Sequence, residues 1–171
     1  MIPSLSHKPT QKRSVGDLIA HSTKLFAKQQ MFLPLWQAQA EIFYPERADF
    51  TTRITDGSER FDHMFGSEPY RMRRDLANTW GSLMRPYGSE WAKLVADPDE
   101  IDKLDEVRIW CEGATARQMK VMYDRRSQFT RAMAQSDNDY ICFGNSIVAI
   151  SDNKDRTGLL FKCLHPRDVA F

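Results

Sequence analysis

Apolar residues recur at helical spacing along most of this 171-residue chain, beginning close to Ser14. Ser14 with Asp17 three residues later has the form of a capping box, in which two side chains bond backbone N–H groups at a helix start. Apolar residues then return at seven-residue intervals on one helical face: Leu18, Ile19, Leu25 and Phe26. The pattern predicts a helix over about 15–30, preceded by a flexible, proline-containing arm over residues 1–13.

A second predicted helix begins at Pro34, a residue that suits a first helical turn, and stops at Pro45, which cannot continue a helix. Apolar residues cover more than half of its circumference, so we expect this helix to be buried. The following segment, residues 46–66, holds glycine, threonine and aspartate without a sustained period. It is predicted to be a polar loop or a short hairpin, and its length is typical of segments that a partner orders.

Residues 68–84 form the third predicted helix, because Ser67 and Pro69 are typical of a helix start and apolar residues follow every three or four positions. The opposite face of this helix carries Arg71 and Arg74, with Arg73 nearby. A solvated face is their ordinary explanation, and a contact with phosphate or with an acidic neighbour is the alternative. A turn and a short segment around Trp91 then lead to Pro98.

Helical spacing continues from Ile101 for more than 30 residues, which at about 1.5 Å per residue makes a helix roughly 50 Å long. A globular domain of this size has a radius of gyration of only about 15 Å. Such a helix overhangs its own domain unless Gly113 breaks it or neighbouring chains cover it. Three carboxylates just before it are expected to stabilise its start through the helix macrodipole rather than to bind a metal ion: Asp97, Asp99 and Glu100.

Near the C-terminus the pattern changes from helix to strand. Gly144 or Asn145 suits the cap that ends a helix, and runs of apolar residues predict strands over about 146–151 and 158–164. Turn residues separate the two strands, so we expect them to pair as a hairpin. Because an isolated hairpin is only marginally stable in water, a helix or further strands should pack against it. The predicted fold class is therefore mainly α with a small β element.

Composition allows a folded domain and limits its class. A chain of this size buries roughly 70% of its unfolded surface, which is enough for a core. Its 24 Lys and Arg against 23 Asp and Glu leave a formal net charge of +1, which argues against a protein that coats nucleic acid or an anionic membrane. The longest apolar run, residues 31–36, is far shorter than the roughly 20 residues that span a bilayer, and no signal peptide is recognisable. We expect cytoplasmic synthesis without membrane contact.

Candidate chemistry is sparse. The sequence contains no phosphate-binding loop, nucleophile elbow, dinucleotide-binding motif or zinc-protease motif. Its cysteines, Cys111, Cys142 and Cys163, form no metal-binding pair and are expected to be buried free thiols. We therefore predict no enzyme activity, no catalytic residue, no cofactor and no metal site.

Five segments occur in an order that resembles one protein family. The segments, with the residues that carry the likeness, are 36–50 with Trp36, Tyr44 and Pro45, 76–86 with Trp80, 91–94 with Trp91, 107–111 with Trp110, and 143–150 with Phe143 and Gly144. Together they resemble the portal, or head-to-tail connector, proteins of short-tailed bacteriophages. The resemblance covers about residues 30–171 and corresponds to the N-terminal, wing-forming portion of such subunits. Residues 14–171 are therefore expected to form a helical, wing-like region, and the sequence to be a fragment of a longer subunit.

The resemblance implies a virion protein that forms a ring, commonly of twelve copies, at one vertex of the capsid. A terminase motor would drive double-stranded DNA through this ring during packaging, and the DNA would later leave into the tail. The expected partners are copies of the same chain, DNA in transit, the terminase, a tail adaptor and the major capsid protein. A channel through which DNA slides should carry little positive charge, because phosphate contacts bind tightly.

Individual residues take structural roles in this hypothesis. The aromatic residues are expected to pack the core, with a subunit interface as the alternative: Trp36, Phe43 and Tyr44 in the second helix, Trp80 and Trp91 against the third, and Trp110 at the start of the long helix. The three arginines of the third helix would pair with a neighbouring subunit or contact packaged DNA. The alternative function is a small helical nucleic-acid-binding or regulatory module that uses the same arginines.

Overall fold

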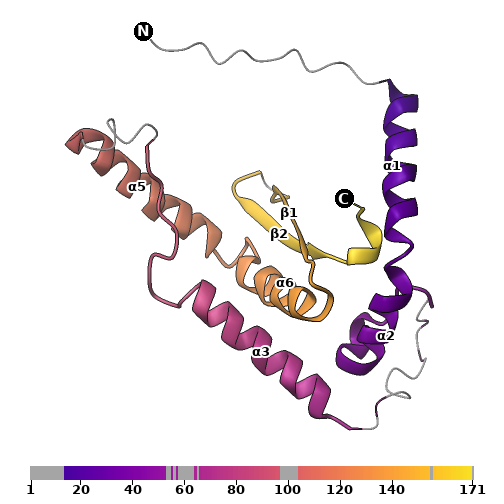
Figure 1. Ribbon diagram of the computed structural model, residues 1–171. Coiled ribbons are helices and arrows are strands. Elements are labelled where there is room, and N and C mark those ends of the chain that lie inside the picture. Colours follow the sequence, from indigo (N-terminus) through magenta and orange to yellow (C-terminus); the bar gives the residue numbers. More distant parts are fainter. Residues whose placement is uncertain are drawn as a thin grey trace.

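The computed structural model describes residues 14–52, 66–96, 104–154 and 156–170, together with positions 55, 57 and 64. Its elements, in order, are α1 (Val15–Gln29), α2 (Leu33–Phe43), η1 (Pro45–Arg47), α3 (Glu68–Met84), α5 (Asp105–Met122), α6 (Phe129–Phe143), β1 (Ile147–Asp152), β2 (Leu159–Leu164) and η2 (Pro166–Asp168) (Figure 1). The predicted fold class, mainly α with a small β element, is confirmed. Three predicted features lie wholly or partly outside the described residues: the arm over 1–13, the 46–66 segment beyond residue 52 apart from positions 55, 57, 64 and 66, and the carboxylates of Asp97, Asp99 and Glu100.

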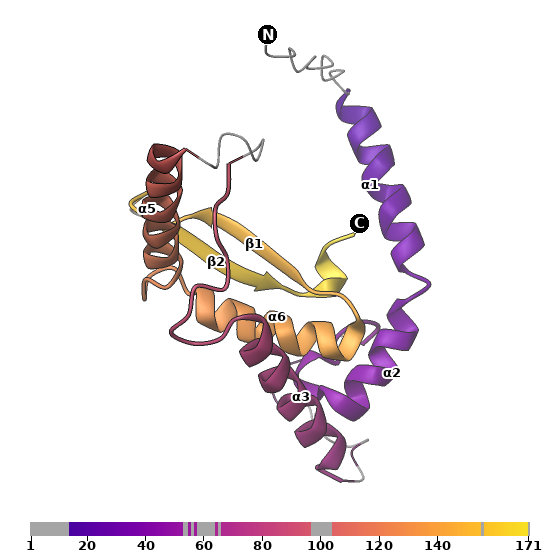
Figure 2. The ribbon, with the colours of Figure 1, turned by 60° about the vertical axis from the view of Figure 1, so that its left-hand side comes forward.

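Helix α6 lies at the centre of the molecule. Helix α3 packs along it, α2 contacts it, and the β1–β2 hairpin lies across it, mainly through β2 (Figures 1 and 2). The hairpin is antiparallel, with Ile147 opposite Leu164 and Asp152 opposite Leu159. The expectation that a helix supports the hairpin is confirmed, and its physical reason is the marginal stability of two strands alone.

Of the helix-end signals at Ser14, Ser67 and Gly144, two act as the sequence predicts. The Ser14 hydroxyl accepts the Asp17 N–H at 3.2 Å, and the Asp17 carboxylate accepts the Ser14 N–H at 3.2 Å, so the capping box is complete. Gly144 caps α6 with a φ of 71°, a left-handed conformation that glycine adopts without strain. Ser67 precedes α3 as predicted, but its side chain makes no capping hydrogen bond.

The predicted long helix is wrong, because α5 and α6 are separate helices joined by a turn at residues 123–128. Gly113 lies inside α5 and does not break it. The break lies instead at Ser127, whose hydroxyl donates to the Met122 carbonyl at the end of α5 and to the Asp124 carbonyl in the turn, and accepts the first N–H of α6. Gln128 then reverses the chain with a φ of 58°. Apolar spacing continues across this turn, which is why periodicity alone did not reveal it.

The described core holds two aromatic clusters, one at each end of α6. The first holds Trp36, Ala40, Ala48, Phe50 and Phe143, and the second holds Phe129, Ala132 and Phe161. Offset and edge-to-face ring pairs are favourable in such clusters. These clusters attach α2 and the hairpin to the same central helix.

The aromatic residues singled out in the sequence divide between core and surface. Trp36 and Pro45 are buried, Tyr44 is half-buried, and Trp80 stacks on Tyr140 of α6. Trp91 stacks on Phe129 of α6 rather than on α3.

Three other expectations of burial fail. Trp110 is 67% exposed, and Phe43 is 40% exposed. The prediction that α2 is buried is also wrong, since Leu35 and Ile42 are exposed and only one face of the helix meets the core.

Candidate functional site

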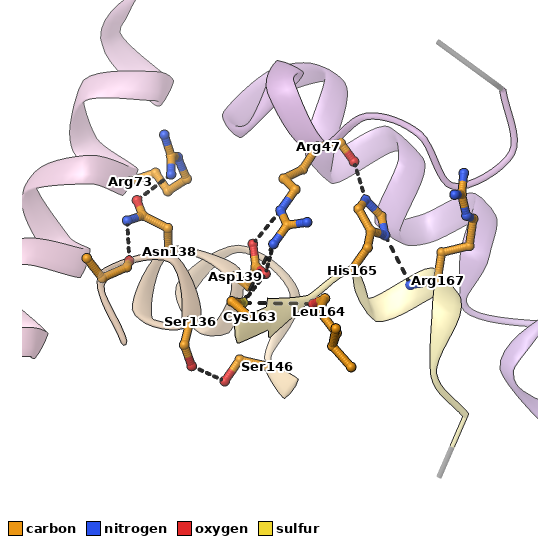
Figure 3. A network of polar contacts seen from close by, with 11 residues as sticks. Arg47, Arg73, Ser136, Asn138, Asp139, Ser146, Cys163, Leu164, His165 and Arg167 are labelled. Atoms are coloured by element: carbon orange, nitrogen blue, oxygen red, sulfur yellow. Dashed lines mark hydrogen bonds and ion pairs between the residues drawn. The ribbon is translucent and has the colours of Figure 1, made fainter. Parts of the chain in front are cut away.

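A buried polar cluster joins η1, α6 and β2 at the centre of the fold (Figure 3). We call it the polar junction, and it comprises Arg47, Asp139, Cys163 and His165. Arg47 forms a two-pronged ion pair with Asp139, with its Nε 3.1 Å from Oδ1 and its Nη2 2.6 Å from Oδ2. The Asp139 side chain is completely buried and that of Arg47 is 12% exposed, so the pair that joins η1 to α6 is shielded from solvent.

The side chains of the polar junction are all paired, and none of them is activated as a nucleophile. The Cys163 thiol donates to the Asp139 carboxylate at 3.2 Å. Burial raises the pKa of the Asp139 carboxyl, and the Arg47 guanidinium opposes this rise. Burial also raises the pKa of Cys163 to about 12 and that of Cys142 to about 12, so both remain thiols at neutral pH. Because the thiolate is the nucleophile, neither cysteine is activated for covalent chemistry.

His165 extends the junction to the chain beyond β2. Its Nδ1 accepts the Arg167 N–H at 3.1 Å, and its Nε2 lies 3.3 Å from the Arg47 carbonyl oxygen. With Nδ1 as acceptor, the proton is assigned to Nε2, which then donates to that carbonyl. Burial lowers the pKa of His165, and the nearby Arg47 guanidinium adds to the lowering. The geometry therefore favours the neutral ring.

Arg73 binds inside the protein and connects α2, α3 and α6. Its Nε donates to the Phe43 carbonyl at 2.9 Å, its Nη1 donates to the Asn138 side chain, and its guanidinium lies 3.8 Å from the centre of the Tyr44 ring. A cation over an aromatic face is stabilised by the ring quadrupole. Arg73 is only 6% exposed, so it acts as an internal link.

The three arginines of α3 divide between the surface and the core. Arg71 and Arg74 are exposed, whereas Arg73 points to the core. Spacing could have revealed this, because Arg73 lies four residues before the buried Ala77 and three after the half-buried Tyr70. The roles predicted for Arg71 and Arg74 stay predictions.

Two further ion pairs, which the sequence did not reveal, hold the outer elements to this centre. Arg85 at the end of α3 pairs with Asp137 of α6, and both side chains are largely buried. Gly81 permits that approach, because a Cβ there would lie 2.7 Å from the Asp137 carboxylate. Arg167 after β2 pairs with Asp49 after η1. Among the described residues, no group of three or more His, Cys, Asp or Glu side chains could hold a metal ion.

Comparison with protein families identifies the group to which this arrangement belongs. The family model described as bacteriophage head to tail connecting protein matches residues 16–171. The chain belongs to this family. The match includes the polar junction, both aromatic clusters and the hairpin, and it confirms the family resemblance found in the sequence. Comparisons with curated proteins and with solved structures gave no match.

Membership implies a connector that associates with head and tail components in the virion. The family is structural rather than catalytic. In the parts of the chain that the structure describes, no helix is long and apolar enough to span a membrane. The interior arginine contacts of this connector suit such a role, because they fix the relative positions of helices without supplying a reactive group.

The polar junction predicts that the stability of the connector depends on pH. His165 has a pKa below 6.5 in the folded chain, so just below pH 6.5 the unfolded chain binds more protons. Stability should therefore fall as the pH drops through this range, and the loss should cease below the folded pKa. We expect the urea midpoint of the unchanged chain to fall more between pH 7 and pH 5 than that of His165→Asn, whose side chain can still accept the Arg167 N–H. Equal falls would contradict the assignment to His165.

Proposed function

We propose that the chain is a ring subunit at the capsid vertex, through which double-stranded DNA enters during packaging and leaves at ejection. The observation that carries the proposal is the family match over residues 16–171. The proposed ring contains twelve copies of the chain. A terminase binds on one side of it, a tail adaptor binds on the other, and the major capsid protein surrounds it. The ring wall would be stiffened by the polar junction and the two aromatic clusters.

The distribution of charge supports passage of DNA without a firm grip. Four arginines are occupied by contacts inside the chain: Arg47, Arg73, Arg85 and Arg167. The chain as a whole has a formal net charge of only +1. Since each phosphate contact adds affinity that opposes sliding, a chain whose positive and negative charges nearly balance suits a conduit.

The alternative, a nucleic-acid-binding or regulatory module, gains little support. With Arg73 inside, α3 presents only Arg71 and Arg74 from the predicted set, and each has a carboxylate close by. The Arg71 and Glu68 side chains approach to 3.9 Å, and those of Arg74 and Asp75 to 4.0 Å. We propose that Arg71 and Arg74 serve as secondary contacts with a neighbouring subunit or with packaged DNA.

Native mass spectrometry and electron microscopy of the purified chain test the proposal. We expect a closed ring of about twelve copies at micromolar concentration, because the family role requires an annulus. A chain that stays monomeric at every concentration would overturn the proposal. Tight, salt-dependent duplex binding that Arg71→Ala and Arg74→Ala abolish would instead favour the alternative function.

A further inference from the structure

Helices α1 and α5 extend from opposite ends of the molecule. Both views place α6 and the hairpin between them (Figures 1 and 2). Neither helix packs extensively against another described helix or strand. Each nevertheless carries large apolar side chains on an uncovered side, so the chain has two separate apolar surfaces at its two ends.

The surface on α1 is a continuous stripe. It consists of Val15, Leu18, Ile19, Ser22 and Phe26, and its four apolar members are between 42% and 73% exposed. The helix is attached to the body near its C-terminal end, where the Gln29 side chain donates to the Pro166 carbonyl at 2.5 Å and to the Val169 carbonyl at 2.9 Å. The α1 stripe therefore extends over a helix that its own chain leaves largely uncovered.

Helix α5 has one covered face and one open face. Cys111 and Thr115 are buried on the covered face, where the Thr115 hydroxyl accepts the Leu94 N–H at 3.0 Å. The open face carries what we call the α5 patch, in which the exposed Arg117 lies between the last two members: Ile109, Trp110, Gly113 and Val121. Ile109 is 65% exposed and Trp110 is 67% exposed, so the patch presents two large apolar side chains to the outside.

Gly113 has no side chain and so leaves a gap in the α5 patch, which we call the Gly113 notch. No contact within the described chain requires this gap. Glycine inside a helix is unfavourable relative to alanine. Within 4 Å of a Cβ at this position there would be only the Arg117 side chain, at 3.9 Å, so nothing in the described chain requires the missing side chain. Ile109 and Trp110, four and three residues earlier, flank the gap on the helix surface. Small residues at such positions allow a second helix to approach closely.

We propose that the α1 stripe of one copy packs on the α5 patch of the next copy, with an apolar side chain seated in the Gly113 notch. The proposal rests on the ring of the proposed function and names the surfaces that build it. The two surfaces match in length, since the stripe from Val15 to Phe26 and the patch from Ile109 to Val121 span about 17 Å and about 18 Å along their helices.

A second copy is the occupant that covers both surfaces with a single kind of contact. A two-fold dimer through either helix alone would cover one surface and leave the other exposed. In a head-to-tail contact each copy offers α1 to one neighbour and α5 to the other, and such contacts close into a ring when the rotation permits. The placement of α1 and α5 at opposite ends of the molecule fits this arrangement.

Cysteine crosslinking in full-length chains tests the contact. Ile19→Cys and Ile109→Cys chains are purified separately, mixed, and treated with a short bismaleimide. We expect a crosslinked dimer only in the mixture, and a ladder of higher multiples when both changes are in one chain. The native thiols should add little background, because Cys111 is buried and burial raises the pKa of Cys142 and of Cys163 to about 12.

Matched controls separate the outcomes. Lys24→Cys with Gln118→Cys places exposed thiols on other sides of the same two helices and should not crosslink. Crosslinks in either isoleucine variant alone would show self-pairing and overturn the head-to-tail contact. Rings in native mass spectra without the Ile19→Cys to Ile109→Cys crosslink would overturn this interface and leave the proposed function standing. Failure of any ring to form would overturn both.

Filling the notch provides a second measurement. Gly113→Leu should leave the circular dichroism spectrum unchanged and weaken ring assembly at least tenfold, because the added side chain keeps the two helices apart. Gln118→Leu adds the same side chain to another exposed side of α5 and should assemble as the unchanged chain does. Unaltered assembly of Gly113→Leu would contradict the seating of a neighbour in the notch.

Discussion

Replacing Asp139 with alanine is expected to destabilise the connector by about 3–5 kcal/mol, because the change leaves a buried guanidinium without its counter-charge. The Arg47 side chain is only 12% exposed, so water cannot replace the lost carboxylate. The Cys163 thiol also loses its acceptor. Urea unfolding followed by circular dichroism measures the change in the free energy of unfolding.

A double substitution separates the cost of the unpaired charge from the value of the pair. Arg47→Met with Asp139→Leu removes both charges together and should cost less than Asp139→Ala, since apolar replacements of a buried pair are often neutral or stabilising. Asp105→Ala is the matched control, because Asp105 pairs with Arg108 at 2.9 Å but its side chain is 80% exposed. It should cost less than about 1 kcal/mol. An Asp139→Ala effect as small as this control would show that the polar junction contributes little.

Local chemistry explains why much of the fold could be predicted from the sequence. The capping box at Ser14, the prolines that bound α2 and the glycine after α6 act within a few residues of their own positions. The start of α1, both ends of α2 and the end of α6 therefore follow from the sequence alone. The α5–α6 turn was not predicted, because Ser127 and Gln128 form it without a glycine or proline. The apolar spacing also stays nearly in phase across the turn.

The polar junction could not be predicted in the same way. Arg47 and Asp139 are 92 residues apart, and their pairing depends on how η1 packs against α6. A sequence shows that charges are present, but it does not show which of them share a buried face. Arg73 illustrates the point, since its neighbours Arg71 and Arg74 are exposed on the same helix. Trp110 shows the opposite outcome: we expected this aromatic side chain to pack in the core, but it is exposed.

In the proposed ring, the interior and the exterior of each subunit have different tasks. Ion pairs and aromatic rings fix α2, α3 and the hairpin to α6, whereas α1 and α5 keep apolar side chains on the surface. Substitutions in the first group should therefore lower the stability of each subunit, and those in the second should lower assembly alone. Measurement of both quantities on every variant distinguishes the two groups.

Phe143→Ala should produce the second large loss of stability, about 3–5 kcal/mol, because truncation of a buried aromatic residue leaves a cavity in the core. The Phe143 ring is 6% exposed, and its centre lies 4.9 Å from that of Phe50, 6.4 Å from that of Tyr44 and 6.5 Å from that of Trp36. Its removal loosens α2 from the end of α6 in one step.

Phe43→Ala provides a matched control for the same chemical change on α2. Phe43 is 40% exposed, so truncation there removes less buried area and should cost clearly less than Phe143→Ala in urea unfolding. Equal losses at Phe43 and Phe143 would contradict the role given to the first aromatic cluster. A large loss confined to Phe143, in a chain that still forms rings below its unfolding transition, would show that subunit stability and ring contacts reside in different residues of the connector.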